Sequence, residues 1–393
     1  MKASYRYLIV GGGMTGAAAA AALRDADPAG SVGLISSEQH PPYARPPLTK
    51  GLWKGDPESG IWRGTDKLGV DLRLGRRAAS LDARAKTVTE TGGDVISYDK
   101  LLLATGGTPR RLPLETDEII YYRTYDDYRK LRALANEQRR FAVLGGGFIG
   151  SEIAAALRLV GRDVTMLVPE AGIAPRVFPT DLSQFLVQYY REQGVDVRTG
   201  ESLAGLTRSG NELKLSTKSG ADVRVDAVVA GIGIQPNVGL AEQAGARVDN
   251  GVVVDELLRT SVPDLFAAGD VANFFNPALD TRMRVEHEDN ANTMGAAAGR
   301  AMAGDTTPYT HLPFFYSDLF ALGYEAVGEL DARLETFSDW KEPFREGVIY
   351  YLKDGRVRGV LLWNTWGQVD AARALIAERR PVRAEQLRGR LPA

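Results

Sequence analysis

The chain has 393 residues, of which 44% are hydrophobic and 25% are charged, as expected for a globular protein of two or three domains. Its 48 basic and 50 acidic side chains give a formal charge of -2 without a long basic run, which disfavours nucleic-acid binding. The roughly 18 uninterrupted apolar residues of a membrane span are absent and the N terminus enters a predicted strand, so we expect no membrane span and a cytoplasmic location.

The first predicted elements are a strand, a glycine turn and an alanine-rich helix in YLIVGGGMTGAAAAAAL, residues 7–23, and the same succession recurs in FAVLGGGFIGSEIAAAL, residues 141–157. The spacing G-x-G-x-x-G allows a tight turn, close approach of a pyrophosphate, and close packing of helix on strand. These glycines are Gly11, Gly13 and Gly16, then Gly145, Gly147 and Gly150. One match is weak evidence because glycines also mark ordinary turns, but two matches in this context predict two dinucleotide sites.

An acidic residue is expected at the end of the strand that follows each helix, where it accepts hydrogen bonds from an adenosine ribose. The stretch RDVTMLVPE ends at Glu170, and SVGLISSE offers Ser37 and Glu38. Because a carboxylate at position 170 repels a 2′-phosphate, we expect NADH to be preferred over NADPH. Arg176, six residues later, weakens that discrimination.

Two dinucleotides in one chain suggest a flavin that accepts hydride from a nicotinamide. LLLATGGTP, residues 101–109, and VPDLFAAGDVA, residues 262–272, resemble other segments of a flavin domain. In the second segment a predicted strand delivers Asp270, ahead of small residues suited to begin a helix. Its carboxylate accepts a hydrogen bond from a ribityl hydroxyl in one interpretation and caps that helix in the other.

Further stretches extend the resemblance along the chain. They are PYARPPLTKGLW, LLLATGGTPR, VLGGGFIGSE, RVEHEDNA, FFYSDLFALGYEAVG and GVIYYLKDGRVRGVLLWN. In this order they resemble the ferredoxin-reductase-like branch of the FAD/NAD(P)H oxidoreductases, most closely bacterial relatives of apoptosis-inducing factor. The resemblance implies an α/β fold class, with two Rossmann-like dinucleotide-binding domains, for FAD and NADH, and a C-terminal α+β domain.

The implied domains are a discontinuous FAD domain at residues 1–111 and 240–310, an NAD(H) domain at 112–239, and a C-terminal domain at 311–393. Within the last domain, two β-type runs around Asp354-Gly355 predict a hairpin. The following QVDAARALIAERR predicts an amphipathic helix.

The resemblance also assigns roles to side chains. It implies that Lys50 and Glu152 form a catalytic ion pair beside the flavin, although two charges so far apart in sequence are by themselves unrelated. Phe148 is either a stacking partner of the nicotinamide or a core aromatic residue, and Tyr316 lies against the flavin. His287 is either a cofactor ligand or a structural hydrogen-bonding residue. The remaining cofactor-binding residues that the resemblance implies are Thr15, Arg45, Ala78, Ala104, Thr105, Gly106, Arg110, Ile149, Gly231, Gly233, Gly269, Glu286 and Glu288.

The chain contains no cysteine, which excludes thiol redox chemistry, and its three scattered histidines predict no metal centre. We therefore expect an FAD-dependent oxidoreductase that accepts hydride from NADH and passes electrons to a ferredoxin or another acceptor. The alternative is an NADH sensor whose long-lived reduced flavin controls dimerisation or partner binding. The aromatic residues of the C-terminal domain either pack in its core or form a homodimer surface, and the sequence leaves both interpretations open.

Overall fold

The computed structural model describes residues 3–391. Two compact units make up the chain, and each contains segments that are distant in the sequence. The first unit comprises Met1–Arg45, Ser59–Thr108 and Gln235–Pro313, and the second comprises Pro46–Glu58, Pro109–Ile234 and Phe314–Ala393. The chain passes between the units five times, at residues 45/46, 58/59, 108/109, 234/235 and 313/314. The third and fourth passages lie in β7 (Gly107–Pro109) and β16 (Ile234–Pro236).

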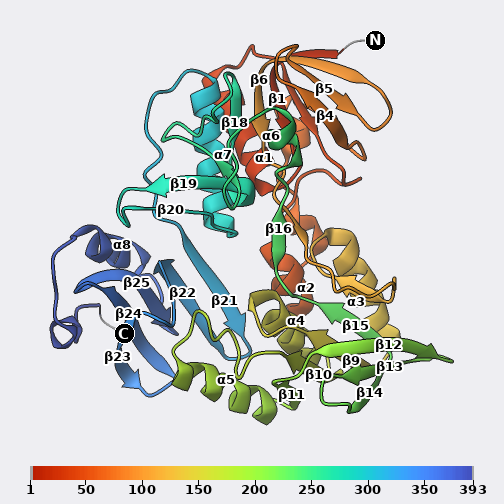
Figure 1. The fold of residues 1–393 in the computed structure, drawn as a ribbon, viewed down its shortest axis with the longest axis vertical. Coiled ribbons are helices and arrows are strands. Elements are labelled where there is room, and N and C mark those ends of the chain that lie inside the picture. Colours follow the sequence, from red (N-terminus) through yellow and green to blue (C-terminus); the bar gives the residue numbers. More distant parts are fainter. Residues whose placement is uncertain (1–2, 392–393) are drawn as a thin grey trace. The chain divides into compact units, whose positions relative to one another are not determined.

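The first unit contains a mixed sheet (Figure 1). Its elements are β1 (Ala3–Val10), α1 (Met14–Ala26), β2 (Val32–Ile35), β3 (Asp71–Arg73), β4 (Ala78–Asp82), β5 (Thr87–Glu90), β6 (Val95–Leu103), α6 (Gly239–Gln243), β17 (Val252–Val253), β18 (Leu265–Ala267), β19 (Ala272–Asn276), β20 (Thr281–Met283) and α7 (Glu288–Met302). The strand order is β3-β2-β1-β6-β5-β4, with β18 also paired to β6. Strands β3, β2, β1, β6 and β18 run parallel. The carboxyl ends of β1, β6 and β18 therefore lie at the same edge of the sheet, and the predicted site residues follow these ends.

Small residues allow helices α1 and α7 of this unit to pack closely. A Cβ atom at Gly295 would lie 2.4 Å from the Thr15 carbonyl oxygen, and one at Gly299 would lie 2.5 Å from that of Ala19. The backbone of α7 therefore touches the backbone of α1, which begins at the first glycine turn.

The second unit contains a parallel sheet, a small antiparallel sheet and a C-terminal antiparallel sheet (Figure 1). The first part consists of α2 (Gly51–Lys54), β8 (Ile119–Tyr121), α3 (Tyr125–Glu137), β9 (Arg140–Leu144), α4 (Phe148–Leu159), β10 (Asp163–Val168), α5 (Thr180–Glu192), β11 (Val195–Thr199), β12 (Leu203–Ser209), β13 (Glu212–Thr217), β14 (Asp222–Val225) and β15 (Ala227–Ala230). The C-terminal part consists of β21 (Phe314–Leu319), β22 (Leu322–Gly328), β23 (Glu335–Glu342), β24 (Glu346–Lys353), β25 (Arg356–Trp363) and α8 (Val369–Ala377).

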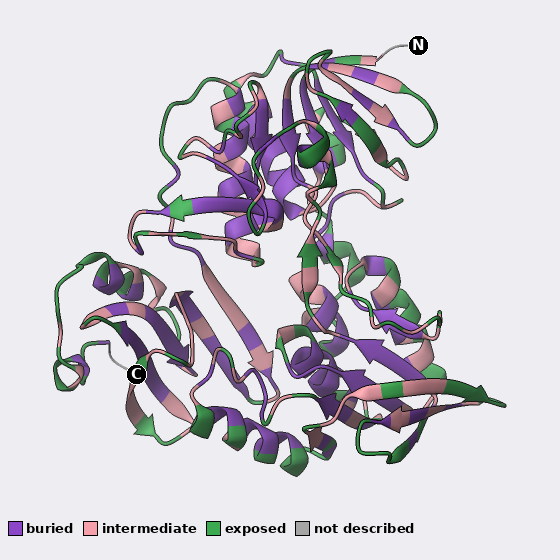
Figure 2. Ribbon diagram, in the orientation of Figure 1, coloured by how far each residue is buried: buried purple, intermediate pink, exposed green. Residues whose placement is uncertain are grey.

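The sheets of the second unit have strand orders β11-β10-β9-β15-β8, β12-β13-β14 and β21-β22-β25-β24-β23. Figure 2 shows that the central strands of the parallel sheet and of the C-terminal sheet are largely buried, as expected for apolar strands that are covered on both faces. In β13, by contrast, buried and partly exposed residues alternate. The predicted hairpin is confirmed, since Lys353 pairs with Arg356 across Asp354 and Gly355, whose φ angles of 51° and 69° suit a tight turn. The predicted helix after it is confirmed as α8.

The predicted fold class is confirmed, but one local prediction is wrong. No helix follows Asp270, because Gly269–Val271 form a single 3-10 turn and the chain continues as strand β19. The apolar and aromatic residues of VANFF favour a strand over a helix. The N-cap alternative for Asp270 is therefore wrong. Among residues 3–391, no helix is long and apolar enough to cross a membrane.

Candidate functional site

The two glycine turns, one in each unit, have nearly the same geometry. Gly11 and Gly145 have φ angles of 126° and 101°, which a residue with a side chain rarely adopts. A Cβ at Gly11 would lie 2.0 Å from the Ala104 carbonyl oxygen, and one at Gly145 would lie 2.6 Å from that of Gly231. Each turn is therefore closed by the backbone that follows a neighbouring strand.

The second glycine of each turn is open on its other side. A Cβ at Gly13 or Gly147 would meet nothing within 4 Å, and no side chain caps the helix that follows either residue. By contrast, a Cβ at Gly16 would lie 2.0 Å from the Gly11 carbonyl oxygen, and one at Gly150 would lie 2.1 Å from that of Gly145. Open space in front of uncapped helix N–H groups fits a pyrophosphate at each turn.

The remaining predicted residues of the first unit lie mostly at the ends of its strands. Thr15 is in the first turn of α1; Ser37, Glu38 and Arg45 follow β2; Ala78 begins β4; Ala104, Thr105 and Gly106 follow β6; Gly269 and Asp270 follow β18; and Glu286, His287 and Glu288 are at the start of α7. A Cβ at Gly269 would lie 2.2 Å from the Thr15 hydroxyl, so the segment after β18 touches the start of α1.

The carboxylate of Glu38 is already held by its own unit. It accepts hydrogen bonds from Arg45, at 2.7 Å, and from the Tyr43 hydroxyl. Ser37 is exposed, whereas Ser36 is buried at the end of β2, with its hydroxyl 2.4 Å from where a Cβ of Gly12 would stand.

Three groups contain the predicted residues of the second unit other than Gly145, Lys50, Glu152 and Tyr316. Gly147, Phe148, Ile149 and Gly150 form the start of α4; Glu170 and Arg176 follow β10; and Arg110, Gly231 and Gly233 lie together, with the Arg110 N–H donating to the Gly233 carbonyl at 2.9 Å. Glu170 and Arg176 approach to 3.8 Å, and the Arg176 side chain is 90% exposed. That exposure makes the contact between them weak.

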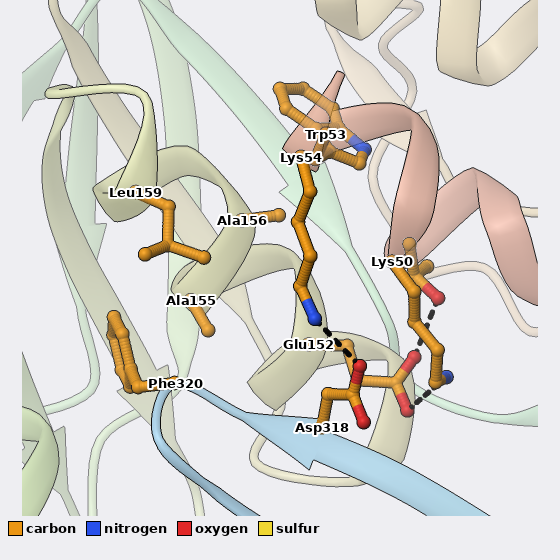
Figure 3. Close-up of a pocket in the computed structure, with 10 residues that line it drawn as sticks. Lys50, Trp53, Lys54, Glu152, Ala155, Ala156, Leu159, Asp318 and Phe320 are labelled. Carbon is orange, nitrogen blue, oxygen red and sulfur yellow. Dashed lines mark hydrogen bonds and ion pairs between the residues drawn. The ribbon is translucent and has the colours of Figure 1, made fainter. Parts of the chain in front are cut away.

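Lys50 and Glu152 come together in the second unit despite their distance in the sequence. The Lys50 ammonium lies 2.7 Å from Glu152 Oε1, and the two side chains are 13% and 4% exposed (Figure 3). Two hydroxyl groups that sequence reasoning missed also donate to this carboxylate. The Ser317 hydroxyl lies 2.6 Å from Oε1 and the Thr49 hydroxyl 2.5 Å from Oε2.

Strand β21 contacts side chains of α4 and side chains at the two ends of α2, next to the Lys50–Glu152 ion pair. Its odd residues face positions 148 and 152 of α4, and its even residues face positions 50 and 54 at the two ends of α2. The four contacts are Phe315 with Phe148, Ser317 with Glu152, Tyr316 with Lys50, and Asp318 with Lys54. The two contacts with α4 form because side chains two apart on a strand and four apart on a helix have similar spacing along one face. Lys50 precedes α2 and is not helical.

Two buried tyrosines border the cluster. Burial, together with the charge of Glu152, raises the pKa of both Tyr190 and Tyr324 well above its ordinary value. Both tyrosines therefore stay neutral near pH 7. Beside Glu152, a cavity of about 10 Å³ is bordered by the Lys54–Asp318 ion pair and by Leu159 (Figure 3). This is about the smallest cavity that can hold one water molecule.

Comparison with known proteins decides the family. Residues 5–295 match the family described as pyridine nucleotide-disulphide oxidoreductase. The chain belongs to this family. Residues 298–343 and 338–378 also match the C-terminal region described as apoptosis-inducing factor, mitochondrion-associated.

Relatives that match almost all of this chain include proteins of two kinds. The chain is 34% identical over 422 residues to apoptosis-inducing factor 1 of Dictyostelium discoideum, a match that covers 96% of this chain and 79% of that protein. It is 35% identical over 387 residues to the ferredoxin–NAD(+) reductase component of the anthranilate 1,2-dioxygenase system of Burkholderia cepacia, with 94% of each chain covered. The putidaredoxin reductase in a solved covalent complex with putidaredoxin is 30% identical, with a TM-score of 0.91, and 98% of this chain and 96% of that chain are covered.

The prediction of an oxidoreductase that uses FAD and NADH is confirmed by membership of this family. The family description includes disulphide chemistry, but this chain has no cysteine with which to perform it. The open glycine turns of both units fit the two dinucleotides.

Proposed function

We propose that the chain is a reductase that transfers electrons from NADH through FAD to a ferredoxin. The observation that carries the proposal is the presence of two open dinucleotide turns in a chain without cysteine. FAD, when bound, takes a hydride from NADH and gives up its electrons to an acceptor. Because the chain has no thiol to receive those electrons, they must pass directly to an external acceptor. The names of full-length relatives support a ferredoxin in that role.

We assign the predicted residues to the two cofactors as follows. The predicted residues of the first unit bind FAD, with Gly13 and the start of α1 at the pyrophosphate and Asp270 at the ribityl chain. Those near the second turn bind NADH, with Phe148 stacking on the nicotinamide. Lys50 presents its ammonium to the flavin, where negative charge develops on reduction, and Glu152 orients it.

Glu170 is assigned to the adenosine ribose of NADH. Its carboxylate repels a 2′-phosphate, and its weak contact with the exposed Arg176 leaves most of this repulsion in place. We therefore propose that NADH is the preferred donor.

The sensor alternative receives less support than the reductase. This chain covers 79% of apoptosis-inducing factor 1 of D. discoideum but 94% of the B. cepacia reductase component.

We also propose the three predicted domains, a cytoplasmic location and a homodimer. The discontinuous first compact unit supports a discontinuous FAD domain.

The test is rapid mixing of the FAD-loaded protein with NADH, followed by addition of an oxidised [2Fe-2S] ferredoxin. We expect fast flavin reduction and fast reoxidation by ferredoxin. Slow decay of the reduced flavin with every ferredoxin tried, together with an NADH-dependent change in sedimentation, would favour the sensor instead. Replacement of Tyr316 by Ala is expected to change the flavin absorbance, because its ring lies 5.2 Å from the Lys50 ammonium.

A further inference from the structure

The carboxylate of Glu152 receives more donors than an ion pair requires. Besides Lys50, at 2.7 Å, the hydroxyls of Ser317 and Thr49 donate to it, at 2.6 and 2.5 Å. Thr49 and Lys50 are adjacent at the start of α2, Ser317 lies in β21, and the Glu152 side chain is only 4% exposed. Neutral hydroxyls therefore do part of what water would do for this buried anion.

Both hydroxyls bond Glu152, and each also has a second partner: Ser317 shares a side-chain hydrogen bond with Tyr324, and Thr49 lies near the Pro46 carbonyl oxygen. Ser317 and Thr49 are 1% and 8% exposed, so little solvent competes for their protons. The Thr49 hydroxyl also lies 3.3 Å from the Pro46 carbonyl oxygen, but its single proton favours the closer and charged acceptor. Ser317 is held in place by its pairing with Tyr324 in the C-terminal sheet.

The other ionisable groups around the carboxylate leave it dependent on these donors. Tyr190 and Tyr324 are neutral, and the Lys54 ammonium is paired with Asp318 at 2.8 Å. Among the described residues, Lys50 is thus the cation that forms an ion pair with Glu152. Without further donors, any movement of this ammonium would leave a buried carboxylate with no hydrogen-bond partner, which is costly.

We propose that Thr49 and Ser317 are positioning residues that keep Glu152 ionised and fixed when the Lys50 ammonium turns away from it. Lys50 has a flexible stem, and its ammonium already lies over the Tyr316 ring. The hydroxyls allow it to turn toward negative charge on a bound flavin and then return to the same carboxylate. This inference rests on the proposed function, since it assigns the movement of Lys50 to flavin reduction.

The experiment removes the two hydroxyls and follows the protonation of Glu152 directly. Thr49→Val, Ser317→Ala and the double variant are prepared with FAD bound. Difference infrared spectroscopy then follows the protonated carboxyl band against pH, with Glu152→Gln as the spectral reference. We expect the midpoint of this titration to rise with each hydroxyl removed, because each removal takes a donor from the buried carboxylate. The acid limb of the pH profile for flavin reduction by NADH should move upward by the same amount.

Matched variants separate positioning from general stability. Thr365 is a buried threonine of the same unit, and its hydroxyl donates only to the carbonyl oxygens of Gly347 and Trp363 in the bonds of the described residues. Thr365→Val should therefore leave both the titration and the pH profile unchanged. Thr49→Ser and Ser317→Thr retain a hydroxyl and should behave as the wild type.

The inference would be overturned by a double variant that melts at the wild-type temperature and has the wild-type titration midpoint and acid limb. The same holds for a Ser317→Thr or Thr49→Ser protein that behaves like the variant without the hydroxyl. If NADH fails to reduce the wild-type flavin, the proposed function is contradicted instead, and the infrared titration still decides whether the hydroxyls keep Glu152 ionised.

Discussion

Replacement of Lys50 by Met tests the central assignment of the site. The substitution keeps most of the buried stem and removes the ammonium that lies 2.7 Å from Glu152. At that distance the attraction is about 6 kcal/mol for an effective dielectric constant of 20, and it is offset by the desolvation of both charges. Removal of one partner of a buried pair usually costs about 3–5 kcal/mol. We expect about 3 kcal/mol here, because two hydroxyls still donate to the carboxylate.

The effect of the same change on reduction of the flavin should be larger than its effect on NADH binding. Loss of one donor aimed at developing negative charge typically slows a reaction by about 10²-fold or more. Stopped-flow absorbance at a series of NADH concentrations separates the limiting rate of flavin reduction from the dissociation constant of NADH. We expect the first to fall about 10²-fold and the second to change by less than about threefold.

Lys54 provides a matched control four residues away. It also forms an ion pair, with Asp318 at 2.8 Å, but these side chains are 48% and 36% exposed. Lys54→Met should therefore cost less than about 1 kcal/mol and leave the reduction rate unchanged. The reasoning is refuted if Lys50→Met reduces its flavin at the wild-type rate, or if Lys54→Met slows reduction equally.

Three further predictions concern the part of the second unit to which we assign NADH. Gly145→Ala combines a φ of 101° with a Cβ 2.6 Å from the Gly231 carbonyl oxygen, so calorimetric titration should show NADH affinity reduced at least about tenfold with FAD still bound; unchanged affinity would contradict the assigned turn. Glu170→Gln should lower the ratio of kcat/KM for NADH over NADPH by about tenfold, because it removes repulsion of the 2′-phosphate; equal efficiency of the wild type with both nucleotides would refute the role of Glu170. Although burial opposes it, hydrogen bonding from Arg140 lowers the pKa of Asp226, so its stabilisation is present above about pH 4 and is lost as the pH falls through the lowered pKa. Asp226→Asn should thus melt at a lower temperature than the wild type at pH 7, with a difference that shrinks below about pH 4, and a constant difference would contradict this.

The sequence by itself determined the features that depend on local backbone geometry. Both dinucleotide turns were predictable, because Gly11 and Gly145 adopt φ angles that favour glycine and the helices that follow are alanine-rich. The hairpin at Asp354-Gly355 was predictable for the same reason. The prediction failed after Asp270, where small residues suggested a helix but the apolar and aromatic residues that follow form β19.

Only the tertiary structure decided which distant side chains share a carboxylate. The resemblance to a family implied that Lys50 meets Glu152, whereas nothing in the spacing indicated that Thr49 and Ser317 donate to the same group. Likewise, Arg45 and Tyr43 donate hydrogen bonds to Glu38, which the sequence predicted to bind a ribose. The physical reason is that a turn depends on the residues that form it. A contact between a strand and two helices depends instead on how those elements pack, and a short stretch of sequence does not specify that packing.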